Sequence, residues 1–195
     1  MAQRPLHVVV RSYLSNDKPR LDRLLSSYSS LPSVEDAVAR AALALDERGK
    51  RHPHQRRLKQ EALEAAKAAL LAVVSDISQA SSFASLHGTV DAATRKINGL
   101  GELYVYDTAL RIGARLSLQP GAVYLHAGTL KGAARLGIPS RGSTVPPGWF
   151  PTQLASLTAP DIENLLCIYK DDLHEQTGAP NNSLEPTRTA GENGN

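Results

Sequence analysis

The stretch Ile97-Asn98-Gly99-Leu100-Gly101 lies between two segments with helical patterns and decides how the chain is organised. A tight reversal between helices favours Asn and Gly, because both tolerate backbone angles that other residues disfavour. The first amides of the following helix have no partner inside it and can donate to a phosphate. The pattern predicts a helix-hairpin-helix turn that contacts nucleic acid through Asn98, Gly99, Leu100 and Gly101. The same glycines also fit a plain turn between helices or a site for a small-molecule phosphate.

Apolar residues recur every three to four positions along most of the chain, which predicts an all-α fold. The expected helices cover residues 21–28, 34–45, 58–77, 86–97, 102–116, 128–136 and a last segment that follows Thr158. Ser33 resembles a helix cap, Gly49 is expected to close the second helix, and residues 6–10 fit a helical turn or a short strand. Asp161 and Glu163 suit the positive end of the last helix. Residues 139–151, rich in Pro, Gly and Ser, are predicted to form a surface loop.

The 195 residues suggest one helical domain, expected at residues 1–176. Residues 177–195 lack apolar periodicity and are predicted to form a disordered tail. A single cysteine excludes an internal disulfide, and we identify neither a signal peptide nor a membrane-spanning run. We therefore expect a cytoplasmic protein with no membrane partner. The sequence leaves the oligomeric state open.

Basic residues are concentrated in one part of the chain. The net charge of +3 is too small to indicate a polyanion partner, but residues 48–59 carry six Lys and Arg without an acid. The segment from Lys50 to Lys59, called the basic segment below, is predicted to contact phosphates. The contacting residues would be Lys50, Arg51, Arg56, Arg57 and Lys59. A solvated loop between helices is the alternative interpretation.

Histidines and acids offer only weak signs of catalysis or metal binding. His52 and His54 have no Cys or carboxylate nearby in the sequence, so we expect hydrogen-bonding histidines and predict no metal and no cofactor. Asp107, Tyr124 and His126 are the catalytic candidates, although Asp107 also fits a helix-stabilising pair with Arg111. Of the two interpretations, a packed Tyr124 and a hydrogen-bonded His126 are the ones we favour. Cys167, between two apolar residues, is expected in the core.

Residues 97–113 resemble the hairpin of helix-hairpin-helix DNA-binding modules, including the endonuclease III-like DNA glycosylase superfamily. In those glycosylases a Val-Asp-Thr-His-like segment follows the hairpin helix and supplies the catalytic aspartate. The comparable residues here run from Val123 to His126, with Tyr124 in place of the aspartate. The lysine of the lyase members falls near Leu103, and the four-cysteine cluster motif is absent. The resemblance therefore implies docking on DNA more than glycosylase chemistry.

Two further resemblances concern the origin of the chain. The strings at residues 51–57, 103–113, 124–129 and 166–170 resemble those of a group of uncharacterised bacterial proteins. Residues 181–188 resemble the translated edge of an integron recombination site, which would place the gene in a mobile cassette. Neither resemblance supplies an activity.

These patterns together lead to one main hypothesis and two alternatives. We expect a DNA-binding protein that contacts the phosphate backbone largely independently of sequence. An enzyme related to DNA glycosylases or nucleases, using Asp107, Tyr124 or His126, is the first alternative. A helical module that binds a protein partner is the second.

Overall fold

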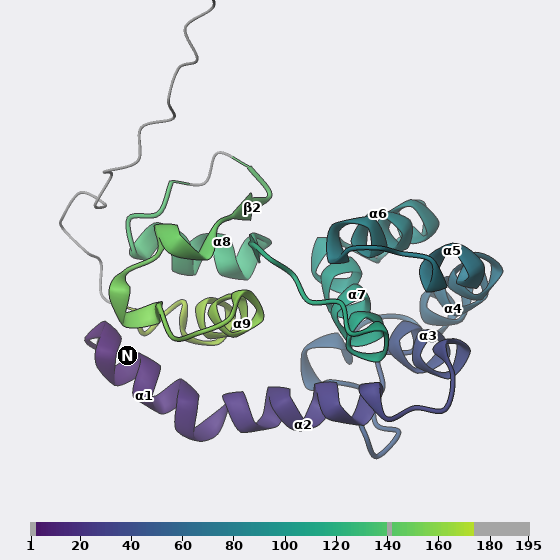
Figure 1. The fold of residues 1–195 in the computed structure, drawn as a ribbon, viewed down its shortest axis with the longest axis horizontal. Helices are drawn as coiled ribbons and strands as arrows, with labels where there is room; N and C mark the ends of the chain where they lie inside the picture. Colours follow the sequence, from purple (N-terminus) through teal and green to yellow (C-terminus); the bar gives the residue numbers. More distant parts are fainter. Residues whose placement is uncertain (1–2, 140–141, 174–195) are drawn as a thin grey trace, which may run out of the picture.

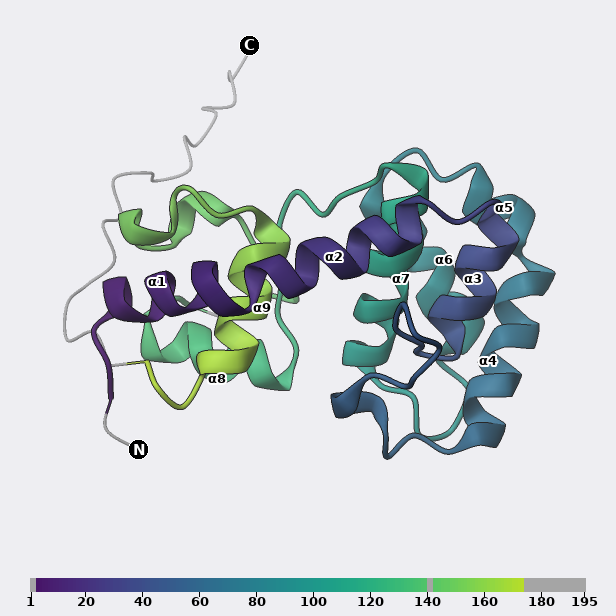
Figure 2. The same ribbon diagram turned by 90° about the horizontal axis from the view of Figure 1, so that it is seen from below.

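Two hydrophobic cores organise the chain in the computed structural model, which describes residues 3–139 and 142–173. Helices α1 (Leu6–Asn16) and α2 (Lys18–Ser29) run nearly in line along the molecule, α1 beside one core and α2 beside the other (Figure 2). Asp17 separates them, and Pro19 lies in the first turn of α2. The chain therefore starts at one core, builds the other, and then returns (Figure 1).

The larger core is built from α2 to α7. Its remaining helices are α3 (Val34–Ala42), η1 (Pro53–Gln55), α4 (Gln60–Ala72), α5 (Val74–Ser78), α6 (Phe83–Thr94) and α7 (Glu102–Leu116). Helix α7 contacts α2, α3 and α6, so most of its side chains are buried. Tyr28, Leu86 and Tyr106 are among the fully buried side chains. This central position explains why α7 has an apolar pattern on more than one face.

The smaller core combines the two ends of the described chain. It contains α1, β1 (Val123–Tyr124), α8 (Ala127–Arg135), β2 (Thr144–Val145), η2 (Pro147–Trp149), η3 (Thr152–Leu154) and α9 (Ala159–Tyr169). The two strands pair antiparallel, with Val123 opposite Val145. Near the N-terminus, the amide of Arg4 donates to the carbonyl of Asp172 at 2.7 Å. That contact ties the first and last described segments together.

Helices α8 and α9 pack unusually closely because two glycines, one helical turn apart, face α9. A Cβ on Gly132 would lie 2.7 Å from the carbonyl oxygen of Leu166, and one on Gly128 would lie 3.1 Å from the thiol of Cys167. A methyl group at position 132 would require the helices to shift, whereas one at position 128 would require the Cys167 side chain to give way. The small residues therefore set how near α8 comes to α9.

The structure confirms the all-α class and the helix cap expected at Ser33. The amide of Asp36 donates to the Ser33 hydroxyl at 3.0 Å, and Thr158 and Asp161 form a reciprocal cap at the start of α9. Residues 6–10 are helical, as one of the two expectations had it. Among the described residues, no helix is long and apolar enough to cross a membrane. The expected tail, residues 177–195, lies outside the described part of the chain.

Several expected boundaries are wrong. The helix expected at residues 58–77 is two helices, because the chain turns at Val73 with φ −113° and ψ 21°. The helix expected at residues 34–45 is α3, and it ends at Ala42. Gly49, at φ +70°, closes a turn instead, and its amide donates to the carbonyl of Asp46. The loop expected at residues 139–151 contains β2, whose pairing partner lies twenty residues earlier in the chain, beyond the reach of a local pattern.

Gly132→Ala is expected to destabilise the fold by about 1–3 kcal/mol, because the added methyl group overpacks the contact between α8 and α9. Gly88→Ala is the matched control, since Gly88 is also helical but has nothing within 4 Å of an added Cβ. It should stabilise α6 by about 0.5–1 kcal/mol. Urea unfolding of both variants measures the difference. Equal stability of the two would contradict the close packing.

Candidate functional site

His126 and Glu163 form a buried polar pair where α8 meets α9. His126 precedes the first residue of α8, and its main-chain amide donates to the Thr129 hydroxyl at 2.7 Å. Its Nε2 lies 2.5 Å from Oε1 of Glu163, and both residues are at most 5% exposed. Burial raises the pKa of Glu163, and the hydrogen bond from His126 offsets part of that rise. The two side chains thus form an enclosed, hydrogen-bonded pair.

Cys167 lies one turn after Glu163 on α9 and joins this pair. Ligand-type atoms of His126, Glu163 and Cys167 all lie within 4.8 Å of one another. Burial first, and then the charge of Glu163, raise the pKa of the Cys167 thiol to about 11. The sulfur is therefore a neutral thiol at pH 7, which argues against a free nucleophile. It is only partly buried and faces polar groups, not the apolar core expected from the sequence.

A second polar group comes from the larger core. His54, in the basic segment, places Nε2 2.7 Å from Oδ2 of Asp107, and Nη2 of Arg111 donates to the same oxygen at 3.3 Å. The expected pair of Asp107 with Arg111 is therefore confirmed. Burial alone would raise the pKa of Asp107, but Arg111 and His54 outweigh it and hold that pKa below its usual value. Asp107 is thus an ionised carboxylate at neutral pH.

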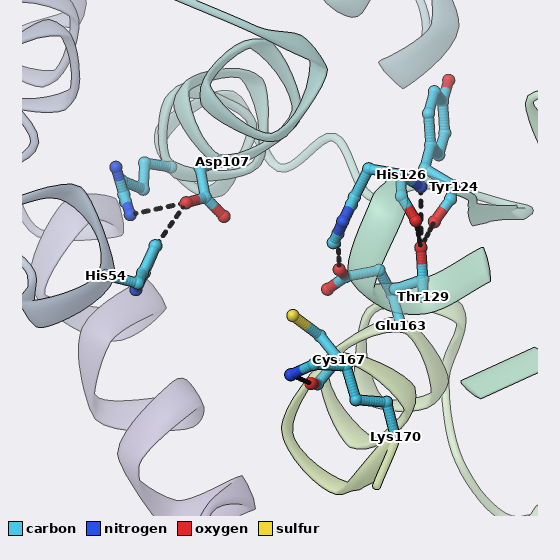
Figure 3. A network of polar contacts seen from close by, with 9 residues as sticks. His54, Asp107, Tyr124, His126, Thr129, Glu163, Cys167 and Lys170 are labelled. Carbon is cyan, nitrogen blue, oxygen red and sulfur yellow. Dashed lines mark hydrogen bonds and ion pairs between the residues drawn. The ribbon is translucent and has the colours of Figure 1, made fainter. Parts of the chain in front are cut away.

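The two groups face each other between the two cores. Figure 3 shows the Cys167 sulfur pointing into the space between the His126–Glu163 pair and the His54–Asp107 pair. The charge of Asp107 also contributes to the raised pKa of both Glu163 and Cys167. We call these five residues the inter-core cluster: His54, Asp107, His126, Glu163 and Cys167. It brings together two of the three catalytic candidates from the sequence, Asp107 and His126.

Tyr124, the third candidate, lies outside the cluster. Its ring packs against His87 at 4.7 Å and against Phe83 and Tyr106 at 5.4 Å between centroids. Burial raises its pKa, and its side chain points away from Glu163 (Figure 3). The expectation of a packed tyrosine therefore holds, and the structure gives Tyr124 no contact through which it could exchange a proton with His126.

A groove of about 410 Å³ lies between α2, the start of the basic segment and α9. Asn164 and Ile168 of α9 line it, together with His52 and Pro53, whereas none of the five residues of the inter-core cluster does. Nε2 of His52 is buried without a hydrogen-bond partner among the described residues.

The predicted hairpin is present. Gly99 has φ +91°, the amide of Leu100 donates to the carbonyl of Ile97 at 3.2 Å, and Gly101 caps the start of α7. Asn98, Gly99 and Gly101 are exposed, and Leu100 is half-buried. Leu100 and Ile97 pack against Leu63, Ala66 and Tyr104, together with Leu58 at the end of the basic segment. The hairpin and the basic segment are therefore neighbours.

Most cations of the basic segment point into solvent. Lys50, Arg56, Arg57 and Lys59 are exposed and form no ion pair with any described residue. Arg51 is different, because it is half-buried, donates to the carbonyl of Leu58 at 3.0 Å and also bonds Gln60. The predicted phosphate contact of Arg51 is therefore opposed by a structural role: its guanidinium group holds the segment in shape.

Comparison of the chain with family models, with curated proteins and with solved structures gives no match.

Sequence reasoning missed Glu163, and it did not join Asp107 to His126. The sequence analysis assigned Glu163 only a favourable charge at the positive end of α9. An acid on the buried face of that helix, beside Ile162 and Leu166, is the signal that could have marked Glu163 as a site residue. His54 and Asp107 are 53 residues apart, so no local spacing relates them.

His52 should make the fold less stable in mild acid. Burial, and secondarily the charge of Arg111, lower its pKa from 6.5 to about 4, against the smaller opposing effect of Asp107. Between those pH values His52 is protonated in the unfolded chain but not in the folded chain, so the free energy of unfolding falls as the pH drops. The expected loss between pH 7 and pH 5 is about 2 kcal/mol.

Urea unfolding of the wild type and of His52→Gln at both pH values isolates this contribution. The variant should lose about 2 kcal/mol less than the wild type on acidification. His7→Gln, at an exposed histidine, should leave the pH dependence unchanged. An identical pH dependence for His52→Gln would contradict the buried neutral state of His52.

Proposed function

We propose that this protein binds DNA through the phosphate backbone, along a surface made by the hairpin and the basic segment. The observation that carries the proposal is the shared packing of Leu58 with Ile97 and Leu100. That packing holds the exposed Arg56 and Arg57 on the same end of the larger core as the hairpin amides. Cations and helix-start amides are the groups that proteins use to contact phosphates.

Binding of this kind depends on charge and not on base sequence. Among the residues that the structure describes, no acid pairs with the exposed cations of the basic segment, so these cations are available to displace counterions from a duplex. Glu102, in the first turn of α7, is an opposing charge close to the hairpin. Affinity should therefore come mainly from the basic segment, with the hairpin fixing where the backbone lies.

Arg56→Ala combined with Arg57→Ala should weaken binding to a labelled duplex and flatten its salt dependence. Each phosphate contact contributes about 0.9 to the slope of log affinity against log salt, so the slope should fall by about 2. Fluorescence anisotropy over a range of salt concentrations measures both quantities. Duplexes of unrelated sequence should behave alike.

The matched control removes two cations from the other half of the molecule. Arg11→Ala with Lys131→Ala changes the net charge equally, at exposed positions on α1 and α8. Lys131 pairs only with the exposed Asp171, so its loss should cost little stability. A wild-type protein that binds no duplex at low salt, or a control pair that weakens binding as much as the first, would refute the proposed surface.

An enzyme acting on DNA is the second candidate function, favoured by the position of Asp107. This ionised carboxylate faces His126 and Glu163 across the inter-core cluster. A fixed carboxylate beside a buried acid can stabilise developing positive charge or accept a proton from water. The reaction class would be base release or strand cleavage, with Asp107 in the role that the resemblance places at Tyr124.

Asp107→Asn should lower the rate of base release or strand cleavage at least about 100-fold while duplex binding stays within a factor of two. The test incubates the wild type with a panel of damaged and modified duplexes and then measures the variant on any substrate. Asp91→Asn, which breaks an exposed pair with Arg95, is the control. Undiminished activity of Asp107→Asn, or no activity on any substrate, would rule against this candidate.

A further inference from the structure

The three donors at the α8–α9 contact are a nitrogen, an oxygen and a sulfur, and they come from only two elements. Glu163 and Cys167 are four residues apart and so lie on one face of α9. Two ligands with this spacing on one helix are a recurring arrangement in zinc sites. His126 reaches them from the start of α8, where the Thr129 hydroxyl fixes its main-chain amide. The donor atoms of these three side chains are therefore already close together in the protein alone.

We propose that His126, Glu163 and Cys167 bind a zinc ion as three protein ligands. Their ligand-type atoms already lie within 4.8 Å of one another. Atoms that coordinate a tetrahedral zinc ion are about 3.3–3.7 Å apart, as follows from zinc-ligand distances of about 2.0–2.3 Å. His126 and Glu163, 2.5 Å apart, therefore have to part slightly to admit the ion.

The donor types favour zinc over the hard cations. Magnesium and calcium prefer sites made of oxygen donors only, whereas imidazole and thiolate suit zinc. Binding converts the Cys167 thiol into a zinc-bound thiolate, and its proton leaves to solvent. Zinc takes the place of the hydrogen bond between His126 and Glu163, so that His126 binds as a neutral imidazole and Glu163 as a carboxylate.

The surrounding charges also suit a divalent cation. With zinc bound, the carboxylate of Glu163 and the thiolate of Cys167 neutralise the ion. The nearby charge of Asp107 is balanced by Arg111, to which it is paired at 3.3 Å. A neutral ensemble is what a buried site requires, because an unbalanced buried charge is costly.

Three protein ligands leave a fourth coordination position. Figure 3 places the His54–Asp107 pair across the space into which the Cys167 sulfur points. Zinc sites with three protein ligands commonly hold a water molecule in the fourth position and lower its pKa. The fourth position would therefore face an ionised carboxylate. The site is independent of DNA binding, since none of its ligands lies in the hairpin or the basic segment.

The test uses the full chain, freed of metal by chelation, and the metal alone. Equilibrium dialysis with Zn²⁺ should give one ion per chain, and Mg²⁺ in large excess should not displace it. Co²⁺ in place of Zn²⁺ should produce a thiolate-to-cobalt charge-transfer band, since the chain has only one cysteine. That band reports Cys167 as a ligand directly and does not depend on any activity.

Cys167→Ser should abolish the band and lower zinc affinity at least 100-fold, and Glu163→Gln, which keeps the side-chain shape, should lower affinity at least tenfold. Glu64→Gln and His7→Ala, both at exposed positions, are the controls and should bind like the wild type. Circular dichroism of the metal-free variants checks that they fold. Wild-type affinity in folded Cys167→Ser, or a cobalt spectrum without the band, would overturn the proposal.

Discussion

The close contact between α8 and α9 is the constraint on which the inter-core cluster depends. His126 reaches Glu163 only because Gly132 lets the two helices approach until a methyl group would touch the backbone of α9. Gly128 leaves the space that the Cys167 thiol occupies. Larger residues at these positions would push α8 away and separate the histidine from its acid. Local backbone packing, and not the polar groups themselves, therefore sets the geometry of the cluster.

The two carboxylates of the cluster are held in different states by their surroundings. Asp107 accepts from both His54 and Arg111, so its negative charge is compensated although the group is largely enclosed. The Glu163 side chain is hydrogen-bonded to His126, and burial raises its pKa. Titratable groups pushed in opposite directions within one site are typical of acid–base chemistry.

Periodicity and caps were enough to predict the helical class, because both depend on neighbours within one turn. Ser33 caps a helix as expected, and a helix follows Thr158, for example. The break at Val73 could not be predicted, since an Ala- and Leu-rich segment favours a continuous helix and packing decides where it turns. The cluster was only partly visible: Asp107 and His126 were candidates, but their convergence depends on the return of the chain from α7 to α8. Glu163 had a sufficient local explanation, which hid its buried position.

The basic segment connects the proposed DNA surface to the interior. Its cations Arg56 and Arg57 face solvent, while His54, two residues earlier, is bonded to Asp107. Gln55 between them is buried, and Arg51 anchors the segment to the carbonyl of Leu58. The exposed cations and the histidine that bonds Asp107 therefore belong to one short segment of the chain.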